Sequence, residues 1–278
     1  MQPLTFVVQP LTLVVRLLAG PVTFARPAAF RYDPGGMAAP AFTPKTLAFL
    51  RSLARHNDRE WFRARKDEYE RHVRAPMVDV IEQLASDFQT FAPELLADPR
   101  RSLYRIYRDT RFSEDKSPLK THIAAVFPPR NGQRHGSAGL YLEVAPRWVW
   151  VGGGLYAPAT ADLYRLREHL CANLTRFRAI VESPGFRRTC DGVRGDRLQR
   201  VPRGFRKDHP AADYLRLKQF LAYREFAPEF ATSPRFYRDM LKVFKAIAPL
   251  VRFLNEGLAT GLETAATAQS SEKTRTTR

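Results

Sequence analysis

The sequence predicts an α+β fold, in which an antiparallel sheet of about four to five strands packs with N-terminal and C-terminal helices into a single domain. Apolar residues recur at helical spacing near both ends of the chain, whereas between them they alternate with a period of two, as in half-buried strands. The connections between the alternating segments are too short for the crossovers that parallel strands require. Helices, then a meander of strands, then helices again is the order of an α+β domain.

The N-terminal helices are indicated by capping signals that precede apolar stripes. Thr43 followed by Pro44 is the typical order of an N-cap and a first helical residue. Asn57, with Glu60 three residues later, predicts a capping box for a second helix. Pro76 is expected to open a third helix.

The strands are predicted from short runs of aromatic and branched residues bounded by Gly and Pro. The three glycines at residues 152–154 are expected to end a hairpin. We predict strands at residues 103–108, 123–127, 140–144, 148–151 and 219–226, a long helix at residues 160–182, and a final helix after Ser233 and Pro234.

Three regions are expected along the chain. Residues 1–37 are predicted to be a leader outside the fold, because residues 2–8 are nearly repeated at residues 9–15. Either translation starts at Met37 or the leader is a dispensable extension, and both are favoured over a secretory signal peptide. Residues 38–260 form the domain, and residues 261–278 are too poor in large apolar residues to order and are expected to be a disordered tail. The apolar run at residues 11–18 is too short to span a bilayer. Two lone cysteines provide neither a disulfide framework nor a zinc site, so we expect a cytoplasmic protein without membrane contact.

The net charge of +17 has two interpretations. It could serve an anionic partner such as a phosphorylated ligand or nucleic acid. Alternatively it reflects composition alone, since 36 of the 45 basic residues are arginine, as GC-rich codon usage would produce. Residues 38–260 carry +14 of this charge, so the excess belongs to the folded body and not to a basic tail.

The densest polar segment, residues 105–122, lies between two predicted strands and is the strongest site candidate. Arginine grips phosphate or carboxylate with two parallel hydrogen bonds, and loops on rigid sheets are where such groups are usually displayed. Asp109 and Asp115 would orient the cations. The predicted anion-binding residues are Arg105, Arg108, Arg111, Lys116, Lys120, Arg167, Lys207 and His209.

This segment reads R-x-Y-R-D-x-R-F-S-x-D-K-S-P-x-K-T-H and resembles the signature of the family called domain of unknown function 2461. The earlier N-D-R-E-W-F and the later G-G-G-L-Y-A-P are similar to that family as well, and the resemblance covers about residues 42–256. Leu119 stands where the family usually has an aromatic residue. The resemblance implies a single domain of this extent, and it implies no activity.

Three functions remain open at this point. The first is binding of an anionic ligand or nucleic acid, and the second is a hydrolase or transferase acting on a phosphorylated substrate. In the second, Asp109 or Asp115 would be the general base or a metal ligand. Metal-dependent phosphodiester chemistry needs a further convergent carboxylate, for which Glu143 is the only candidate, so no metal site is predicted. The third is a structural protein in which the aspartates merely pin the arginines. Cofactor and oligomeric state are not indicated.

Two tryptophans, Trp148 and Trp150, are expected on one face of their strand. They could stack bases as in sheet-based RNA readers. Their Leu and Val neighbours favour the alternative that this is a core face or a face covered by a helix.

Overall fold

The computed structural model describes residues 41–132 and 136–275, with side chains through residue 259. Its centre is a four-stranded sheet in the order β1-β2-β3-β4, and each neighbouring pair is antiparallel. This confirms the predicted α+β class and the antiparallel pairing. The strands are β1 (Ile123–Phe127), β2 (Gly139–Val144), β3 (Val149–Leu155) and β4 (Phe220–Phe226).

Helices precede and follow the sheet. The N-terminal group consists of α1 (Pro44–Arg55), α2 (Arg59–Ala64), α3 (Lys66–Tyr69), the π-helical turn η1 (Glu70–Arg74), α4 (Ala75–Phe91) and α5 (Pro99–Ser102). Between β3 and β4 lie α6 (Thr160–Ala172), α7 (Leu174–Val181), α8 (Pro184–Thr189) and α9 (Ala212–Leu215), and the 3-10 helix η2 (Pro228–Thr232) and α10 (Phe236–Arg275) follow β4.

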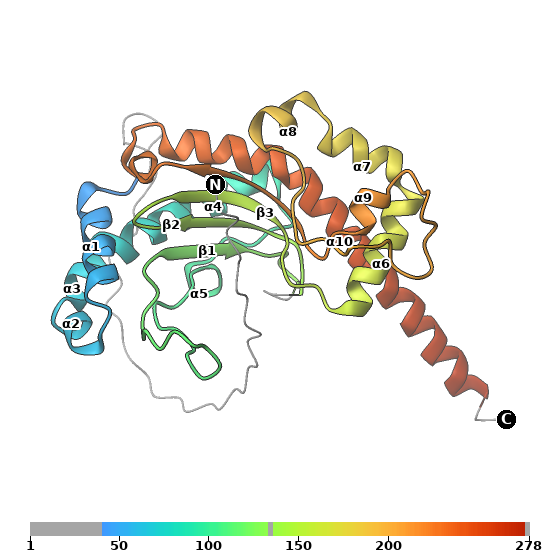
Figure 1. Cartoon of the computed structure of the whole chain (residues 1–278), viewed down its shortest axis with the longest axis horizontal. Coiled ribbons are helices and arrows are strands. Elements are labelled where there is room, and N and C mark those ends of the chain that lie inside the picture. The colour runs from blue at the N-terminus through green and yellow to red at the C-terminus, as the bar shows by residue number, and fades with distance from the viewer. Residues whose placement is uncertain (1–40, 133–135, 276–278) are drawn as a thin grey trace.

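Helices α4 and α10 cover one face of the sheet (Figure 1). Phe88 of α4 and Phe244 of α10 pack on Phe127 of β1, with ring centroids 5.4 Å and 5.8 Å away. A side chain at Gly153 of β3 would lie 3.1 Å from Ile247 of α10. Apolar residues at alternate positions therefore supply the buried face, as the period of two predicts.

The opposite face carries polar and aromatic residues. Val149 and Val151 are fully buried on the helix side, so alternation directs Trp150 away from α4 and α10. The Trp150 ring lies 6.0 Å from Trp148 and 5.4 Å from Tyr223 of β4. The helix-covered interpretation of the two tryptophans is therefore wrong, because they occupy the other face of the sheet.

Residues 103–108 do not form a fifth strand. Leu103 pairs with Ala125 of β1 in an isolated bridge, and Tyr107 pairs instead with Leu119. After this one residue pair with β1 the chain leaves the sheet, and it pairs instead with residues of the same loop that return toward β1. The aromatic and branched composition of residues 103–108 therefore predicted a strand wrongly.

Two further expectations fail because of local backbone chemistry. The helix predicted at residues 160–182 is interrupted at Asn173, whose side-chain amide donates to the His169 carbonyl at 2.9 Å, and α7 starts afresh. The three glycines do not end the hairpin but lie inside β3. At Gly154 a Cβ would sit 1.9 Å from the Phe220 carbonyl and φ is 133°, so only glycine lets β4 pair there.

At the N-terminal end, Thr43 is the N-cap of α1 as predicted. Helix α2 is capped by Asp58 rather than Asn57, because the Asp58 carboxylate accepts the Trp61 N–H at 2.7 Å. Pro76 stands within the first two positions of α4, which continues from the π-helical turn.

The predicted leader, residues 1–37, lies outside the described residues. Helix α10 has its bounds at Phe236–Arg275, and side chains from residue 260 onward are likewise outside the description, so the disordered tail stays a prediction. Within residues 41–132 and 136–275, no helix combines the length and the apolar character that crossing a membrane requires.

Candidate anion-binding pocket

A loop between α5 and β1 folds back on itself and encloses a pocket. Its outgoing and returning arms are joined where the Arg108 N–H donates to the Pro118 carbonyl at 2.9 Å and the Lys120 N–H donates to the Ile106 carbonyl at 2.8 Å. The cavity has a volume of about 510 Å³. It is lined by Ala54, Asn57, Arg105, Tyr107, Arg108, Asp109, Phe112, Asp115, Ser117, Leu119, Lys120, Thr121 and His122.

Asp115 organises the turn at one wall of the pocket. Its carboxylate accepts the Ser117 hydroxyl at 2.6 Å and the Ser117 N–H at 2.9 Å, and it also forms an ion pair with Arg108. These hydrogen bonds, first from Ser117 and then from Arg108, hold the pKa of Asp115 well below its usual range. Asp115 is therefore a carboxylate that fixes the position of Arg108, as the sequence suggested.

Asp109 plays the same part for Arg111. The Asp109 carboxylate accepts from Arg111 Nε at 3.0 Å and from Arg111 Nη2 at 2.7 Å. The side-chain bond from Arg111 lowers the pKa of Asp109 to about 2. Arg111 does not line the pocket, and neither does Lys116, whose ammonium donates to the Thr110 carbonyl at 3.1 Å.

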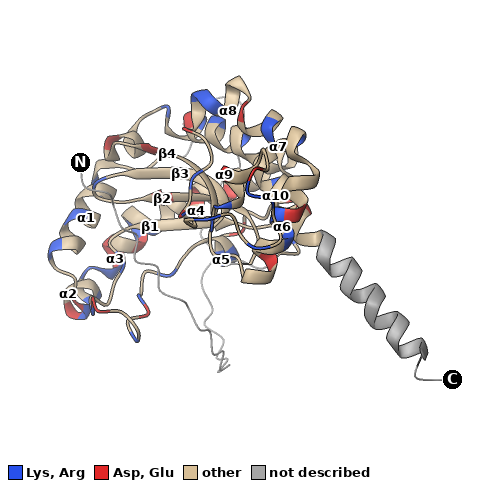
Figure 2. Ribbon diagram, turned by 45° about the vertical axis from the view of Figure 1, so that its right-hand side comes forward, with Lys and Arg blue, Asp and Glu red and all other residues tan. Residues whose placement is uncertain are grey.

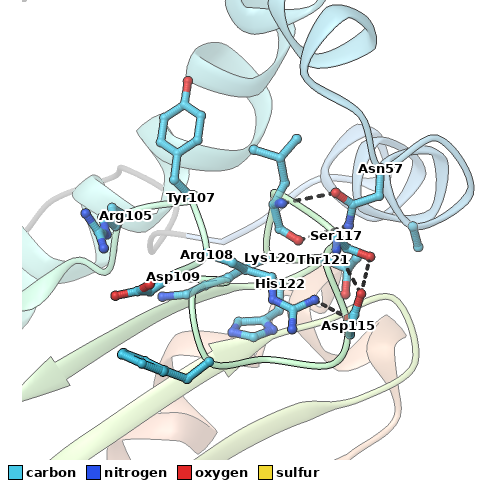
Figure 3. A pocket seen from close by; sticks show the side chains of 13 residues that line it. Asn57, Arg105, Tyr107, Arg108, Asp109, Asp115, Ser117, Lys120, Thr121 and His122 are labelled. Carbon is cyan, nitrogen blue, oxygen red and sulfur yellow. Dashed lines mark hydrogen bonds and ion pairs between the residues drawn. The ribbon is translucent and has the colours of Figure 1, made fainter. Parts of the chain in front are cut away.

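Three predicted cations do line the cavity: Arg105, Arg108 and Lys120. In Figure 3 the Arg108 guanidinium lies beside the His122 ring near the centre of the view, whereas Arg105 stands at the edge with its guanidinium directed away from Arg108. The Lys120 ammonium lies 4.8 Å from the centre of the Tyr104 ring, a cation–π distance. Arg108 and Lys120 thus line the same cavity from the outgoing and the returning arm of the loop.

His122 connects the pocket with the face of the sheet opposite α4 and α10. Its Nε2 atom lies 3.8 Å from a carboxylate oxygen of Glu143 on β2. Desolvation lowers the pKa of His122, although Glu143 opposes this effect, and Lys120 and Arg108 add to the lowering. The direction of this shift favours the neutral imidazole.

Glu143 is buried, with both of its oxygens engaged. The Tyr141 hydroxyl donates to one oxygen at 2.5 Å, and the Trp148 indole N–H donates to the other at 2.8 Å. Burial, followed by the charge of Glu143, raises the pKa of Tyr141, so its hydroxyl stays protonated and can donate. The sequence suggested Glu143 only as a metal ligand. Its donors are Tyr141, two residues earlier on β2, and Trp148, on the other side of the hairpin turn.

Asn57 also belongs to the pocket, although the sequence suggested a helix cap. Its amide donates to the Leu119 carbonyl at 2.9 Å, and its oxygen accepts the Leu119 N–H at 3.1 Å. The N-D-R-E-W-F stretch that contains Asn57 was the available signal, but no local pattern indicates a partner 62 residues away.

The structure does not bring the other predicted site residues to this pocket. Arg167 lies on α6, at the end of the molecule opposite α1–α3 (Figure 1). It is buried, donates to the Leu217 carbonyl at 2.9 Å, and has its pKa lowered by desolvation. His209 accepts the Ala211 N–H at 3.1 Å, and Lys207 is exposed in the same connection before α9.

Charged residues of the described chain are distributed over the surface around the pocket and not in one cluster. Figure 2 shows basic residues spread over helices and loops and interspersed with acidic ones, so the excess charge is not confined to one element. Among the described side chains, no group of three or more His, Cys, Asp or Glu residues is arranged to hold a metal ion.

Comparison with known proteins places the chain in a family. The model of a family described as conserved hypothetical protein (DUF2461) matches residues 45–253, which include all of the pocket, the sheet and most of the helices. No curated protein and no solved structure was found to match. Because the family model spans most of the chain, the chain belongs to the DUF2461 family of conserved hypothetical proteins.

Proposed function

We propose that the pocket formed by residues 105–122 binds a phosphorylated or other anionic ligand. The observation that supports this proposal is the convergence of Arg108 and Lys120, from the two arms of one loop, on a single cavity of about 510 Å³. Cavities of about 300–1,000 Å³ are typical of small-molecule sites. Asp115 holds Arg108 in place before any ligand arrives, which reduces the ordering cost of binding.

The enzymatic alternative receives less support from the same contacts. The carboxylates of Asp109 and Asp115 accept hydrogen bonds from arginine and serine donors, and the pKa of each carboxylate is below its usual range. A general base is most effective when its pKa lies near the working pH. We therefore assign the two aspartates to positioning cations and not to proton transfer.

The structural alternative also receives little support. Each pair has one largely exposed partner: the Arg111 side chain is 60% exposed beside Asp109 at 19%, and the Asp115 side chain is 59% exposed beside Arg108 at 26%. Water therefore reaches both pairs. Exposed ion pairs contribute little to stability. A bracing lattice would need pairs that are shielded from water.

The test compares matched loop cations. Arg108→Gln and Lys120→Gln remove charges that line the pocket, whereas Arg111→Gln and Lys116→Gln remove equal charges from the same loop outside the lining. A hydrogen bond to a charged group contributes about 1.5–3 kcal/mol, so each pocket variant should weaken binding of inorganic phosphate roughly tenfold or more. Isothermal titration calorimetry at low salt is the measurement.

The control variants should keep the affinity of the parent within a few-fold. Equal weakening by all four variants would indicate diffuse electrostatic attraction and contradict a built pocket. Absence of phosphate and sulfate binding to the parent would contradict the proposal outright.

A further inference from the structure

Exposed aromatic side chains gather at the pocket. In the described part of the chain, four large hydrophobic side chains are exposed, and two of them, Phe112 and Tyr107, line this one cavity. Phe112 is 65% exposed and is the most exposed of the four. Single exposed hydrophobic residues need no explanation, but two beside clustered cations point to a ligand with an apolar surface.

The two rings are held differently. Tyr107 packs edge-on against Phe62 at 6.0 Å, and Figure 3 shows its ring directed toward the helices, away from Arg108. The Phe112 ring lies 5.8 Å from the Arg111 guanidinium, which Asp109 grips through two hydrogen bonds. Phe112 is therefore supported by a fixed neighbour while most of its surface stays in water.

We propose that the anionic ligand is a nucleotide, whose phosphate binds Arg108 and Lys120 and whose base stacks on Phe112. This inference rests on the proposed function. Phenylalanine has no polar side-chain atom, so it offers a planar apolar surface and no hydrogen bond. A nucleobase presents a flat π-face that stacks on aromatic rings in a sequence-tolerant way. A sugar phosphate has no π-face to stack on Phe112.

The size of the pocket agrees with a single small ligand of this kind. A volume of about 510 Å³ lies within the range of about 300–1,000 Å³ for small-molecule sites, which is the size class expected for a single nucleotide unit. The unit could be a free nucleotide or the phosphorylated end of a strand, because both present the same phosphate and base.

The experiment separates phosphate from base. Titration calorimetry would compare adenosine 5′-monophosphate with ribose 5-phosphate on the parent, Phe112→Ala and Phe112→Tyr. Stacking of one base on an aromatic side chain corresponds to roughly 5- to 150-fold in affinity. We expect the parent to prefer the nucleotide by such a factor, Phe112→Ala to abolish the preference, and Phe112→Tyr to restore it.

Tyr164→Ala is the matched control, because Tyr164 is 41% exposed but lies on α6 outside the pocket lining. It should leave both affinities unchanged. A 5′-phosphorylated dinucleotide distinguishes a free nucleotide from the phosphorylated end of a strand as the ligand. Tighter binding of the dinucleotide than of the mononucleotide indicates a strand end, and equal binding indicates a free nucleotide.

Two failures can be told apart. If the parent binds both ligands equally, or Phe112→Ala weakens both alike, the nucleotide inference is wrong while phosphate binding stands. If neither ligand binds, or Arg108→Gln leaves both affinities intact, the proposed function itself fails.

Discussion

Asn57 holds Leu119 by both of its backbone groups. The side-chain amide of Asn57 donates to the Leu119 carbonyl at 2.9 Å, and the amide oxygen accepts the Leu119 N–H at 3.1 Å. Leu119 is fully buried, so neither backbone group has ready access to water. The returning arm of the pocket loop is thereby tied to the connection between α1 and α2.

Replacing Asn57 by alanine should destabilise the protein and loosen the pocket. Leaving buried backbone groups without partners costs about 1–3 kcal/mol, so the denaturant midpoint should fall accordingly. Phosphate affinity should also fall, since the arm that carries Lys120 loses its tether. Urea unfolding and calorimetry are the two measurements.

Asn255 provides the control. Its amide holds the Ala138 carbonyl at 3.0 Å and its oxygen accepts the Ala138 N–H at 2.9 Å, in the same manner but outside the pocket lining. Asn255→Ala should cost comparable stability and leave phosphate affinity unchanged. A loss of affinity in both variants would show that general destabilisation, not the tether, is responsible.

Glu143→Gln should destabilise the protein by about 1–3 kcal/mol, because glutamine offers one acceptor where two donors converge. Either the Tyr141 hydroxyl or the Trp148 N–H would face an amide NH₂. Glu225→Gln is the matched change at the exposed Trp150–Glu225 contact of 2.6 Å, where water can replace the lost acceptor. Equal unfolding midpoints for the two variants would contradict this account of Glu143.

His122 should make stability fall in mild acid. Desolvation lowers its folded-state pKa below the ordinary value of about 6.5, so at lower pH the unfolded chain takes up a proton that the folded protein resists. The free energy of unfolding is therefore expected to decline as the pH drops from about 6.5 toward the lowered pKa. His122→Gln should make this decline shallower in urea unfolding measured from pH 7.5 to 5. Parallel curves for parent and variant would refute the assignment.

Anion affinity should respond to the same proton in the opposite direction. A bound anion stabilises the protonated imidazole, so affinity for sulfate, which does not titrate in this range, should rise as the pH falls from 7 to 5.5. His122→Gln should remove the dependence. His169 on α6 also has its pKa lowered by burial, and His169→Gln should keep the dependence of sulfate binding intact.

Arg111→Gln and Lys116→Gln should leave the unfolding midpoint close to that of the parent. The Arg111 side chain is 60% exposed and Lys116 is also exposed, so water replaces the lost contacts. Thermal and urea unfolding of the two variants provide the check. Strong destabilisation by both, together with no anion binding by the parent, would favour the scaffold interpretation of the loop.

Much of the fold was predictable because it follows from patterns of apolar and capping residues over short stretches of the sequence. Alternation identified β1 and β2, the return of the chain in a hairpin identified β3, residues 219–226 matched β4, and Thr43 marked the start of α1. The pattern failed at residues 103–108, where composition suits a strand but pairing with Leu119 draws the chain off the sheet. It failed again at Asn173, where one side-chain hydrogen bond ends a helix whose apolar stripe continues.

Local patterns in the chain were enough to predict the α+β class, the family and the loop that carries the dense charge, because periodic burial and turn chemistry act over a few residues. The folded structure was needed to show that Arg108 and Lys120 share a cavity while Arg111 and Lys116 do not. It also decided that Asn57 ties the loop and that Glu143 faces His122. These relationships join residues far apart in the chain, and they arise from packing that no local periodicity encodes.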